Sequence, residues 1–270
     1  MKLSVIIIEF HCMEDVKGCV ASVGERLGAI EVECLVVVNS GYAEEQLAQY
    51  RSELDSVRWV IANDNLGYAG GVNLGLAEAS GEYVYVLNPD CRLTDDGVIA
   101  MMDAMSAEQD WGIAGPRVVD GEGELQPSCR RFPRPWTFLL VRSVLACLPG
   151  AGAERRRYLM EDYDRESDRD VDWVSGGAVL VKRSALDSIG DMDTRYFLYM
   201  EDVDWCHSSW LNGYSVRYFT GSTVVHAGQH QSISGGIMSK LSSAHVRWHL
   251  KSMASYFAKF GLALPKAGPK

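Results

Sequence analysis

An aspartate follows an apolar stretch of the chain, within the segment Glu82–Cys91. Tyr83–Leu87 is an uninterrupted apolar run rich in β-forming residues, which is typical of a strand buried on both faces. Because Pro89 cannot donate a hydrogen bond to a sheet, the strand ends there and Asp90 lies at its carboxyl end. Ligands of open α/β sheets bind at that end, and a carboxylate there suits a divalent cation that holds a diphosphate. Taken alone, the pattern more often marks a plain turn with a solvated aspartate.

A glycine-rich turn, Asn63–Asn73, is the second candidate, and it lies between a predicted strand and a predicted helix. Its glycines are Gly67, Gly70 and Gly71. They let a ligand approach the backbone, and the N–H groups of the following helix are available to a phosphate. The spacing does not fit the Gly-x-Gly-x-x-Gly pattern of dinucleotide sites. The amides of Asn65 and Asn73 suit ligand hydroxyls and bases, although a plain capping turn explains the glycines about equally well.

Further candidates lie in the second half of the chain. Glu201 and Asp202 begin a predicted helix, a position where the helix dipole alone favours acidic residues. The aromatic residues before them would desolvate a carboxylate and could tune it as a base. These residues are Tyr196, Phe197 and Tyr199. His226 ends the short predicted strand Thr223–His226; a lone histidine is usually an ordinary surface or core residue, but here a carboxylate-rich site can lie nearby.

The elements that must position these residues follow from the apolar periodicity. Strands are predicted at Leu3–Ile8, Glu33–Val38, Val57–Ala62, Tyr83–Leu87 and near Trp111–Gly115. Helices are predicted at Glu14–Leu27, from the loop at Asn39–Gly41 through about Leu54, and from the glycine-rich turn to Ala79. Two more are predicted at Asp95–Ala107 and from Glu201 to about Leu211. Such alternation with short loops predicts a parallel, doubly wound α/β sheet.

The pattern is less regular in the middle of the chain. Asp120–Gly123 predicts a hairpin turn. Pro135–Leu148 is too short to span a bilayer and predicts a buried helix, with a surface-lying membrane helix as the alternative. Glu154–Asp170 is densely charged and predicts a mobile, solvated loop. Asp172–Val181 predicts a strand that is reached through a Gly-Gly bend.

Length and composition are those of a globular protein. The 270 residues suffice for one large α/β domain, with or without a small appendage, and the apolar (47%) and charged (23%) shares are ordinary. The seven cysteines include no Cys-x-x-Cys pair, which indicates reduced thiols in a cytoplasmic protein rather than disulfides or a zinc site. Glu9 and His11 interrupt the apolar N-terminal run, so a first strand is predicted rather than a signal peptide, and no run reaches the roughly 20 residues of a membrane span.

Charge is distributed unevenly along the chain. The net charge is −10, but the residues after Asp204 carry +7 and no acidic residue, which leaves −17 for residues 1–204. The basic end is expected to meet something anionic, namely a membrane surface, a pyrophosphate or the acidic body of the protein. Nucleic acid is not expected, because no basic-aromatic module accompanies the charge.

Lys240–Phe260 has apolar residues at roughly helical spacing and predicts a C-terminal basic amphipathic helix packed on the acidic body. The alternative is a peripheral contact with the inner face of the cytoplasmic membrane. Its cations would be Lys240, Arg247, Lys251 and Lys259.

Five motifs, taken in order, make the chain resemble family 2 glycosyltransferases of the GT-A fold, within the bacterial rhamnosyltransferase-like group. They are Ser4–Ile8, Asn65–Asn73, Asn88–Asp90, Trp173–Ala178 and Phe197–Asp204, followed by His226. Each motif is weak alone, but the ordered set covers nearly the whole chain. The resemblance implies a Rossmann-like, doubly wound, mainly parallel sheet with a C-terminal acceptor-side region and a terminal helix. The implied parts are a nucleotide-sugar-binding half (1–115), an acceptor-side and catalytic half (116–236), and a C-terminal basic amphipathic helix and tail (237–270).

The resemblance also implies roles for single residues. Asp90 is the metal-binding member of a reduced Asp-x-Asp motif, His226 is a further metal ligand, and Asp202 is the catalytic base. The acceptor-side residues are Trp173, Gly176, Gly177 and Glu201. The donor-binding residues are Glu9, Asn39, Asn65, Gly71, Asn73 and Asn88.

Two departures concern the donor. The family usually has Asn-Tyr-Asn after the first strand, where this chain has Glu9-Phe10-His11. After the second strand Val38 stands where the family has an aspartate that contacts the nucleoside. Glu9, at the neighbouring strand end, is the candidate for a compensating carboxylate.

The function implied is that of an inverting, metal-dependent glycosyltransferase using Mg²⁺ or Mn²⁺. A sugar, with rhamnose as the first choice, would move from a dTDP- or UDP-linked donor to a hydroxyl of a glycan or lipid-linked saccharide in bacterial surface polysaccharide synthesis. The metal would offset charge on the diphosphate, and Asp202 would take the proton of the attacking hydroxyl.

Two alternatives remain. A non-catalytic nucleotide-sugar or glycan-binding relative is favoured by Val38, but a binder needs neither Asp202 as a base nor Asp90 and His226. A nucleotidyltransferase would need a basic phosphate loop near the N-terminus, which the sequence lacks.

Overall fold

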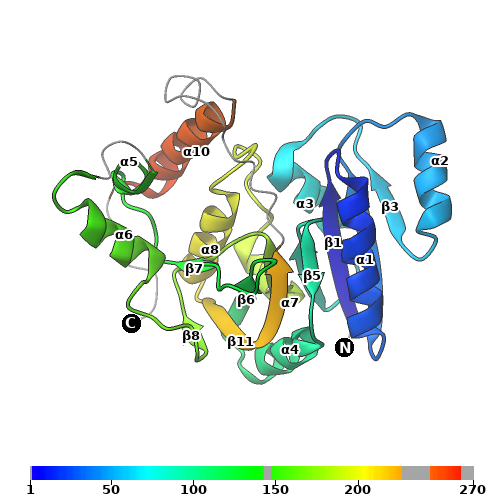
Figure 1. Ribbon diagram of the computed structural model, residues 1–270, viewed down its shortest axis with the longest axis horizontal. Helices are drawn as coiled ribbons and strands as arrows, with labels where there is room; N and C mark the ends of the chain where they lie inside the picture. Colours follow the sequence, from blue (N-terminus) through cyan, green and yellow to red (C-terminus); the bar gives the residue numbers. More distant parts are fainter. Residues whose placement is uncertain (1, 143–146, 227–243, 263–270) are drawn as a thin grey trace.

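The computed structural model describes residues 2–142, 147–226 and 244–262. Its centre is a mixed sheet whose strands follow the order β3-β2-β1-β4-β10-β6-β11-β5 (Figure 1). The first four are parallel and comprise β1 (Lys2–Glu9), β2 (Glu31–Val38), β3 (Arg58–Ile61) and β4 (Tyr83–Leu87). The others are β5 (Cys91–Leu93), β6 (Trp111–Val119), β10 (Ala178–Lys182) and β11 (Ser215–His226). The predicted mainly parallel sheet is confirmed, with β10 antiparallel to both β4 and β6 at its centre and β5 antiparallel to β11 at its edge.

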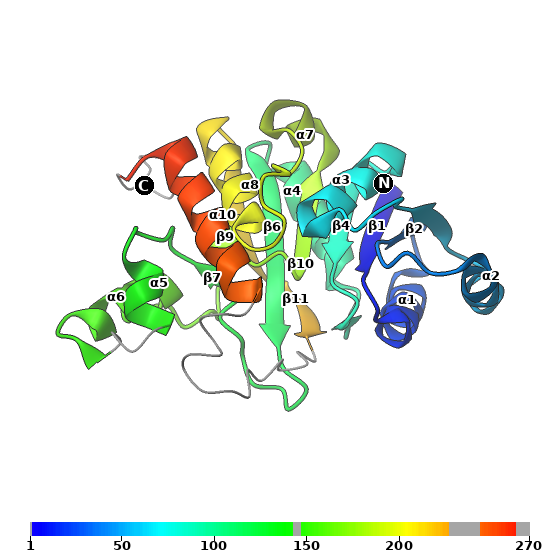
Figure 2. The same cartoon turned by 90° about the horizontal axis from the view of Figure 1, so that it is seen from above.

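Helices cover both faces of this sheet, and Figure 2 shows α1 and α3 on opposite sides of β1. The helices are α1 (Met13–Leu27), α2 (Glu44–Glu53), α3 (Gly67–Glu78), α4 (Gly97–Ala107), α5 (Thr137–Arg142), α6 (Ala151–Leu159), α7 (Arg183–Ile189), α8 (Glu201–Leu211) and α10 (Ala244–Phe260). Side chains alternate along β4, so Val84 and Val86 join one core cluster while Tyr83, Tyr85 and Leu87 join the other. Two covered faces explain why this strand is continuously apolar.

The predicted solvated loop at Glu154–Asp170 is wrong. Its first residues belong to α6, and β8 (Arg169–Asp170) pairs with β11. Glu154 is buried, where it accepts hydrogen bonds from Thr137 and Arg157 and lies 3.3 Å from Arg134. A carboxylate that is paired with two cations can be buried, so a high local charge did not mean exposure here.

Other expected elements differ in extent. Within Pro135–Leu148 the described helix is only α5, which buries Phe138 but leaves Leu139 exposed; residues 143–146 lie outside the described part. The predicted strand Asp172–Val181 is two strands in different sheets: β9 (Trp173–Val174) pairs with β7 (Cys129–Arg130), and β10 lies in the main sheet. The break between them is the Gly-Gly turn, where a Cβ at Gly176 would lie 3.3 Å from the Cβ of Asp202. The turn at Asp120–Gly123 is confirmed by the hydrogen bond from Asp120 N–H to the oxygen of Glu124.

The C-terminal helix α10 packs on the segment that precedes α8 and on α8 itself. Its buried face includes Met253 and Tyr256. Ser252 Oγ donates to the carbonyl oxygen of Leu198 at 2.9 Å. The ammonium of Lys259 lies 2.7 Å from Asp204 and 3.1 Å from Asp193. The helix was predicted to pack on the acidic body, and Lys259, a surface cation only in the membrane alternative, neutralises two carboxylates of that body.

The interface between α8 and α10 also buries His207. Its Nδ1 lies 3.0 Å from the hydroxyl of Tyr256, and its ring stacks on Phe260 at 3.9 Å. Burial, followed by the charge of Lys259, lowers the pKa of His207 from 6.5 to about 4. The unfolded chain therefore binds a proton here between these two pH values while the folded protein does not, so acidification through this window destabilises the fold.

We expect wild-type protein to lose about 2 kcal/mol more unfolding free energy than His207→Gln between pH 7 and pH 5. Urea unfolding at both pH values measures this difference. The glutamine variant can still reach Tyr256 by a hydrogen bond but does not titrate. Equal pH dependence in the two proteins would show that His207 keeps an ordinary pKa.

Candidate active site

Asp90 and His226 meet at the carboxyl end of β4. The turn after β4 is held by hydrogen bonds from Cys91 N–H to the oxygen of Asn88 (3.0 Å) and from Asn88 N–H to the oxygen of Gly177 (2.8 Å). The chain then enters β5, which pairs with β11 so that Cys91 lies opposite His226. As a result, Asp90 Oδ2 lies 3.3 Å from His226 Nε2, although the two residues are distant in sequence.

Both side chains remain accessible, with about a quarter of each exposed (25% for Asp90 and 27% for His226). Burial alone would raise the pKa of Asp90, but the hydrogen bond and charge of His226 outweigh it and hold that pKa below its usual value. The same hydrogen bond raises the pKa of His226 against the effect of burial. The two groups therefore stabilise each other in their charged forms.

Gln126 orients the imidazole. Its Nε2 donates to the main-chain oxygen of His226 at 3.2 Å, which turns its Oε1 towards Nδ1 of the same residue, also at 3.2 Å. Nδ1–H then donates to Gln126, and Nε2 is the ring nitrogen that faces Asp90 and can bind a metal once it has lost its proton. Outer hydrogen bonds of this kind are typical of histidines that bind metals.

Among the residues that the structure describes, only Asp90, Cys91 and His226 bring three potential metal-ligand atoms within 4.8 Å of one another. Burial raises the pKa of the Cys91 thiol well above its usual value, and its Sγ lies 3.1 Å from the oxygen of Gly177, so the thiol stays protonated. One carboxylate oxygen and one imidazole nitrogen remain as donors. They suit Mg²⁺ or Mn²⁺ and leave most coordination positions open to a phosphate ligand.

Asp202 lies at the start of α8 and accepts a hydrogen bond from Gly176 N–H at 3.0 Å. Burial raises the pKa of Asp202, while the N–H groups of Gly176 and Val203 and the charge of Arg130 oppose this effect. Its neighbour Glu201 is buried, and no described residue hydrogen-bonds its Oε2.

Burial and the charge of Asp202 raise the pKa of Glu201 well above its usual value. We therefore assign the negative charge of the pair to Asp202 and a proton to Glu201. An ionised Asp202 with a half-buried side chain is suited to accept a proton from a hydroxyl.

The glycine-rich turn is hydrogen-bonded both to the segment before α8 and to the Gly-Gly turn. Gly67 has φ of +69°, and a Cβ there would collide with the main-chain oxygen of Phe197, so the turn needs glycine. Tyr68 N–H donates to that same oxygen at 2.9 Å, and Tyr68 Oη donates to the oxygen of Gly176 at 2.6 Å. The turn at Gly176 and Gly177 thus connects the start of α8 to the end of β4. Tyr68 was missed in the sequence because nothing local shows that its hydroxyl reaches a turn more than 100 residues away.

The expected contact of Glu9 with a nucleoside does not fit the structure. Glu9 is completely buried, and its carboxylate accepts hydrogen bonds from Ser40 Oγ (2.7 Å), Tyr42 Oη (2.8 Å) and Cys12 N–H (3.1 Å). A carboxylate with three protein donors and no exposed surface orders the loops around it rather than binding a ligand.

Two other residues of the expected donor set are also engaged within the protein. Asn39 is buried and bonds to Leu66 N–H, Asn65 Oδ1 and the oxygen of Gly67. Asn73 donates to and accepts from the backbone of Met192 at 2.7 and 3.0 Å.

The other three residues of the expected donor set are Gly71, Asn65 and Asn88. Gly71 lets α3 approach β1, since a Cβ there would lie 2.9 Å from Ile8. Asn65 is exposed and Asn88 is half-buried, so both can still reach a ligand.

Trp173, expected on the acceptor side, lies behind the surface. Its indole is only 3% exposed and donates to the oxygen of Arg131 at 2.9 Å. The guanidinium of Arg130 covers it, with 5.0 Å between the guanidinium carbon and the ring centroid. Arg130 was not among the expected site residues, although the sequence marks it: Arg130 and Arg131 form a basic pair within the acidic part of the chain.

Comparisons with known proteins identify the family of the chain. The family model described as glycosyl transferase family 2 matches residues 4–190. The chain is 32% identical over 218 residues to the N-acetylglucosaminyl-diphospho-decaprenol L-rhamnosyltransferase of Mycobacterium tuberculosis, covering 75% of this chain and 67% of that protein. It is 25% identical over 266 residues to the rhamnosyltransferase WbbL of Escherichia coli, covering 94% and 92% of the two chains.

A solved structure shares the fold. The crystal structure of GalNAc-T7 with UDP, GalNAc and Mn²⁺ superposes with a TM-score of 0.61 at 16% identity, over 84% of this chain and 44% of that one. Within the described ranges, no helix has the length and apolar character needed to cross a membrane. The family match covers more than half of the chain and includes the end of β4 and the Gly-Gly turn. The chain belongs to glycosyltransferase family 2, has the GT-A fold, and is a rhamnosyltransferase-like glycosyltransferase.

Proposed function

We propose that this enzyme is an inverting, metal-dependent rhamnosyltransferase acting on a lipid-linked saccharide in bacterial surface polysaccharide synthesis. The donor is a nucleoside-diphosphate sugar, with dTDP or UDP as the nucleotide. The observation that carries the proposal is the Gly-Gly turn, which joins the Asp90–His226 pair at Asn88 to the carboxylate of Asp202 at Gly176. The names of the two rhamnosyltransferase relatives support the choice of sugar, and one of those names specifies a diphospho-decaprenol acceptor.

Asp90 and His226 would hold a Mg²⁺ or Mn²⁺ ion. When bound, the ion offsets the negative charge on the leaving diphosphate. Asp202 accepts the proton of the acceptor hydroxyl while that oxygen attacks the anomeric carbon on the face opposite the diphosphate. Gly176 N–H fixes the carboxylate of Asp202 by a 3.0 Å hydrogen bond, so the base is oriented before the substrates bind. The neutral Glu201 adds no second negative charge to the site.

The donor and acceptor are tested together by mass spectrometry. The protein is incubated with Mn²⁺, a panel of dTDP- and UDP-linked sugars, and N-acetylglucosaminyl-diphospho-polyprenol. We expect the acceptor to gain one deoxyhexose, most efficiently from dTDP-rhamnose. Tight donor binding without transfer from any sugar nucleotide would favour the alternative, a non-catalytic nucleotide-sugar-binding relative.

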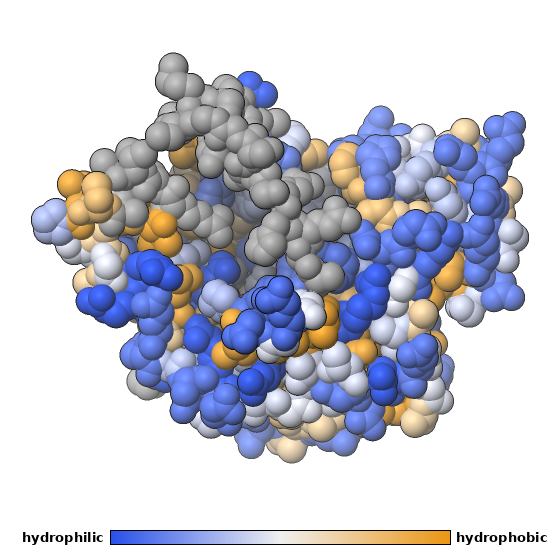
Figure 3. Space-filling model, viewed as in Figure 1, coloured by the Kyte–Doolittle hydropathy of each residue, from blue (hydrophilic) through white to orange (hydrophobic). Residues whose placement is uncertain are grey.

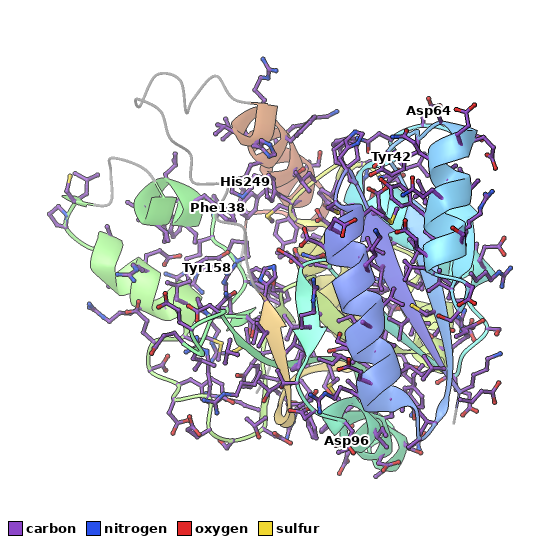
Figure 4. All side chains as sticks on the ribbon, turned by 45° about the vertical axis from the view of Figure 1, so that its right-hand side comes forward. Tyr42, Asp64, Asp96, Phe138, Tyr158 and His249 are labelled. Carbon is purple, nitrogen blue, oxygen red and sulfur yellow. The ribbon has the colours of Figure 1, made fainter. Side chains whose placement is uncertain are left out.

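We further propose that the side of the molecule around α5 and α10 rests on the inner face of the cytoplasmic membrane. Trp136, Leu139 and Leu148 are exposed apolar residues around α5, and Figure 3 shows hydrophobic surface at this edge. The ring of Phe138 lies 4.5 Å from that of His249, which holds α5 beside α10 (Figure 4). The exposed residues of α10 include Arg247, Leu250 and Lys251. Lys240, expected to contribute, lies outside the described residues.

We expect the protein to sediment with anionic vesicles at low salt. Each cation near such a surface contributes about 1 kcal/mol, so Arg247→Gln with Lys251→Gln should weaken partitioning by roughly 10- to 30-fold. The double variant Lys2→Gln with Arg26→Gln makes the same charge change elsewhere and should sediment like the wild type. If the two double variants behave alike, or the wild type stays in the supernatant, this face does not bind the membrane. Lys259 is left unchanged because its ion pairs hold α10 in place.

A further inference from the structure

A pocket of about 130 Å³ lies beside His226 on the side of the β7–β9 ribbon, and most of its residues have no role in the reaction described above. Its polar lining consists of Gln126, Ser128, Arg130, Ser175, Gly177 and His226. Cavities of about 150 Å³ hold a molecule the size of benzene, so a phosphate group fits here. The lining offers an arginine and hydroxyl groups, which are typical of anion sites.

Arg130 is held rigidly at the wall of this pocket. Its Nε donates to the oxygen of Pro127 at 3.0 Å, and its guanidinium lies over the rings of Trp173 (5.0 Å) and Tyr158 (5.8 Å). In the described part of the chain no carboxylate lies within ion-pair distance of it. A guanidinium that is already stacked and oriented loses little freedom when its remaining N–H groups bind a phosphate.

Ser128 is a second, independent sign of a ligand. It is 8% exposed, and its Oγ is fully enclosed without a hydrogen bond to any residue that the structure describes. Its backbone is fixed, since the main-chain oxygen of Ser128 accepts from Ser175 N–H at 2.7 Å. Buried hydroxyl groups nearly always have a partner, so an acceptor atom from a bound molecule is expected in the pocket.

We propose that this pocket binds a phosphate group of a diphosphate, with Arg130 and Ser128 as the hydrogen-bond donors. The proposal rests on the function proposed above, which brings two diphosphates to this site. One is the leaving group of the sugar donor, and the other links the acceptor saccharide to its lipid. Both carry the same chemistry, so the pocket defines a phosphate subsite and the source is decided by experiment.

The subsite is tested first without catalysis, by calorimetric titration with inorganic pyrophosphate in metal-free buffer. Arg130→Met should weaken binding by about 10- to 100-fold, and Arg130→Lys should weaken it less, because lysine keeps the charge but not the two parallel donors. Arg117→Met is the matched control: Arg117 faces the exposed Glu166 and does not line the pocket, so its affinity should stay close to wild type. No binding of pyrophosphate by wild-type protein at millimolar concentration overturns the proposal, as does equal loss in both methionine variants.

Ser128→Ala separates a ligand contact from a structural one. Because the hydroxyl has no partner among the described residues, its removal should not lower the melting temperature, yet it should weaken pyrophosphate binding several-fold. A lower melting temperature with unchanged affinity would show that the hydroxyl is structural. This variant and Arg130→Lys also decide the question if Arg130→Met does not fold.

Steady-state kinetics then identify the source of the phosphate. If Arg130→Met raises KM for the diphosphate-linked acceptor but not for the same saccharide as an alkyl glycoside, the phosphate belongs to the acceptor. If it weakens binding of the nucleoside diphosphate instead, the phosphate belongs to the donor. Both results support the subsite, and no change in either overturns it. Arginine-dependent pyrophosphate binding without any sugar transfer would refute the proposed function and leave the subsite standing.

Discussion

Asp202→Asn is expected to reduce turnover by a factor on the order of 10²–10⁴ and to leave donor binding almost unchanged. The amide oxygen of asparagine can still accept the hydrogen bond from Gly176 N–H, so the geometry of the turn persists. It cannot accept a proton from the acceptor hydroxyl. Glu201 is not expected to replace it, because burial, the first cause of its raised pKa, persists when the charge of Asp202 is removed. Initial rates at saturating donor and acceptor measure the loss, and calorimetry with the donor measures binding.

Two variants in the same helical turn serve as controls. Asp204→Asn makes the same chemical change at a carboxylate that bonds to Tyr196 and Lys259, so it should lower stability but keep turnover. Glu201→Gln should keep turnover within about threefold, because a neutral amide replaces a neutral acid of the same shape. Near-normal turnover in Asp202→Asn together with a large loss in Glu201→Gln would transfer the role of base to Glu201.

Asp90→Ala should remove the metal-dependent part of donor binding, a loss on the order of 100-fold in affinity in the presence of Mn²⁺. Without Asp90, His226 is the remaining metal ligand of the group, since the thiol of Cys91 stays protonated. A single imidazole binds a divalent cation too weakly to keep it at the site, so the cation can no longer link the diphosphate to the protein. Calorimetric titration of the nucleoside-diphosphate sugar with and without Mn²⁺ measures the difference.

Asp96→Ala is the matched control for this experiment. Asp96 is exposed at the start of α4, and its side chain makes no capping hydrogen bond, so its removal makes the same charge change without altering the ligand set (Figure 4). We expect this variant to keep the full response to Mn²⁺. If donor affinity is the same with and without Mn²⁺ in the wild type and in Asp90→Ala, Asp90 has no metal role.

The sheet and the place of Asp90 at the end of β4 could be predicted from the sequence. Tyr83–Leu87 is continuously apolar because both faces of β4 are covered, and Pro89 ends the strand so that Asp90 lies at its carboxyl end. Gly67 marked a turn in which no Cβ fits, Gly176 and Gly177 marked a second turn, and the two turns meet beside Asp202. All of these signals are local, because strand burial, strand termination and tight turns depend on neighbouring residues.

The roles of several polar side chains were decided by tertiary structure alone. Glu9 was expected to face a ligand but is enclosed by Ser40 and Tyr42, which belong to a loop after another strand. Glu154 looked solvated but is buried by Arg134 and Arg157. A carboxylate has the same residue type whether it faces water, a cation or a hydroxyl, so only its neighbours in space distinguish these cases.

The pairings that build the candidate site also belong to tertiary structure. His226 reaches Asp90 through the register of β11 on β5, and Arg130 reaches the pocket through the register of β7 on β9. The sequence determined which residue types were available and at which strand ends they lie. It did not determine which of them meet, because strand register and hydrogen-bond partners are set by contacts between segments separated by 40 to more than 100 residues.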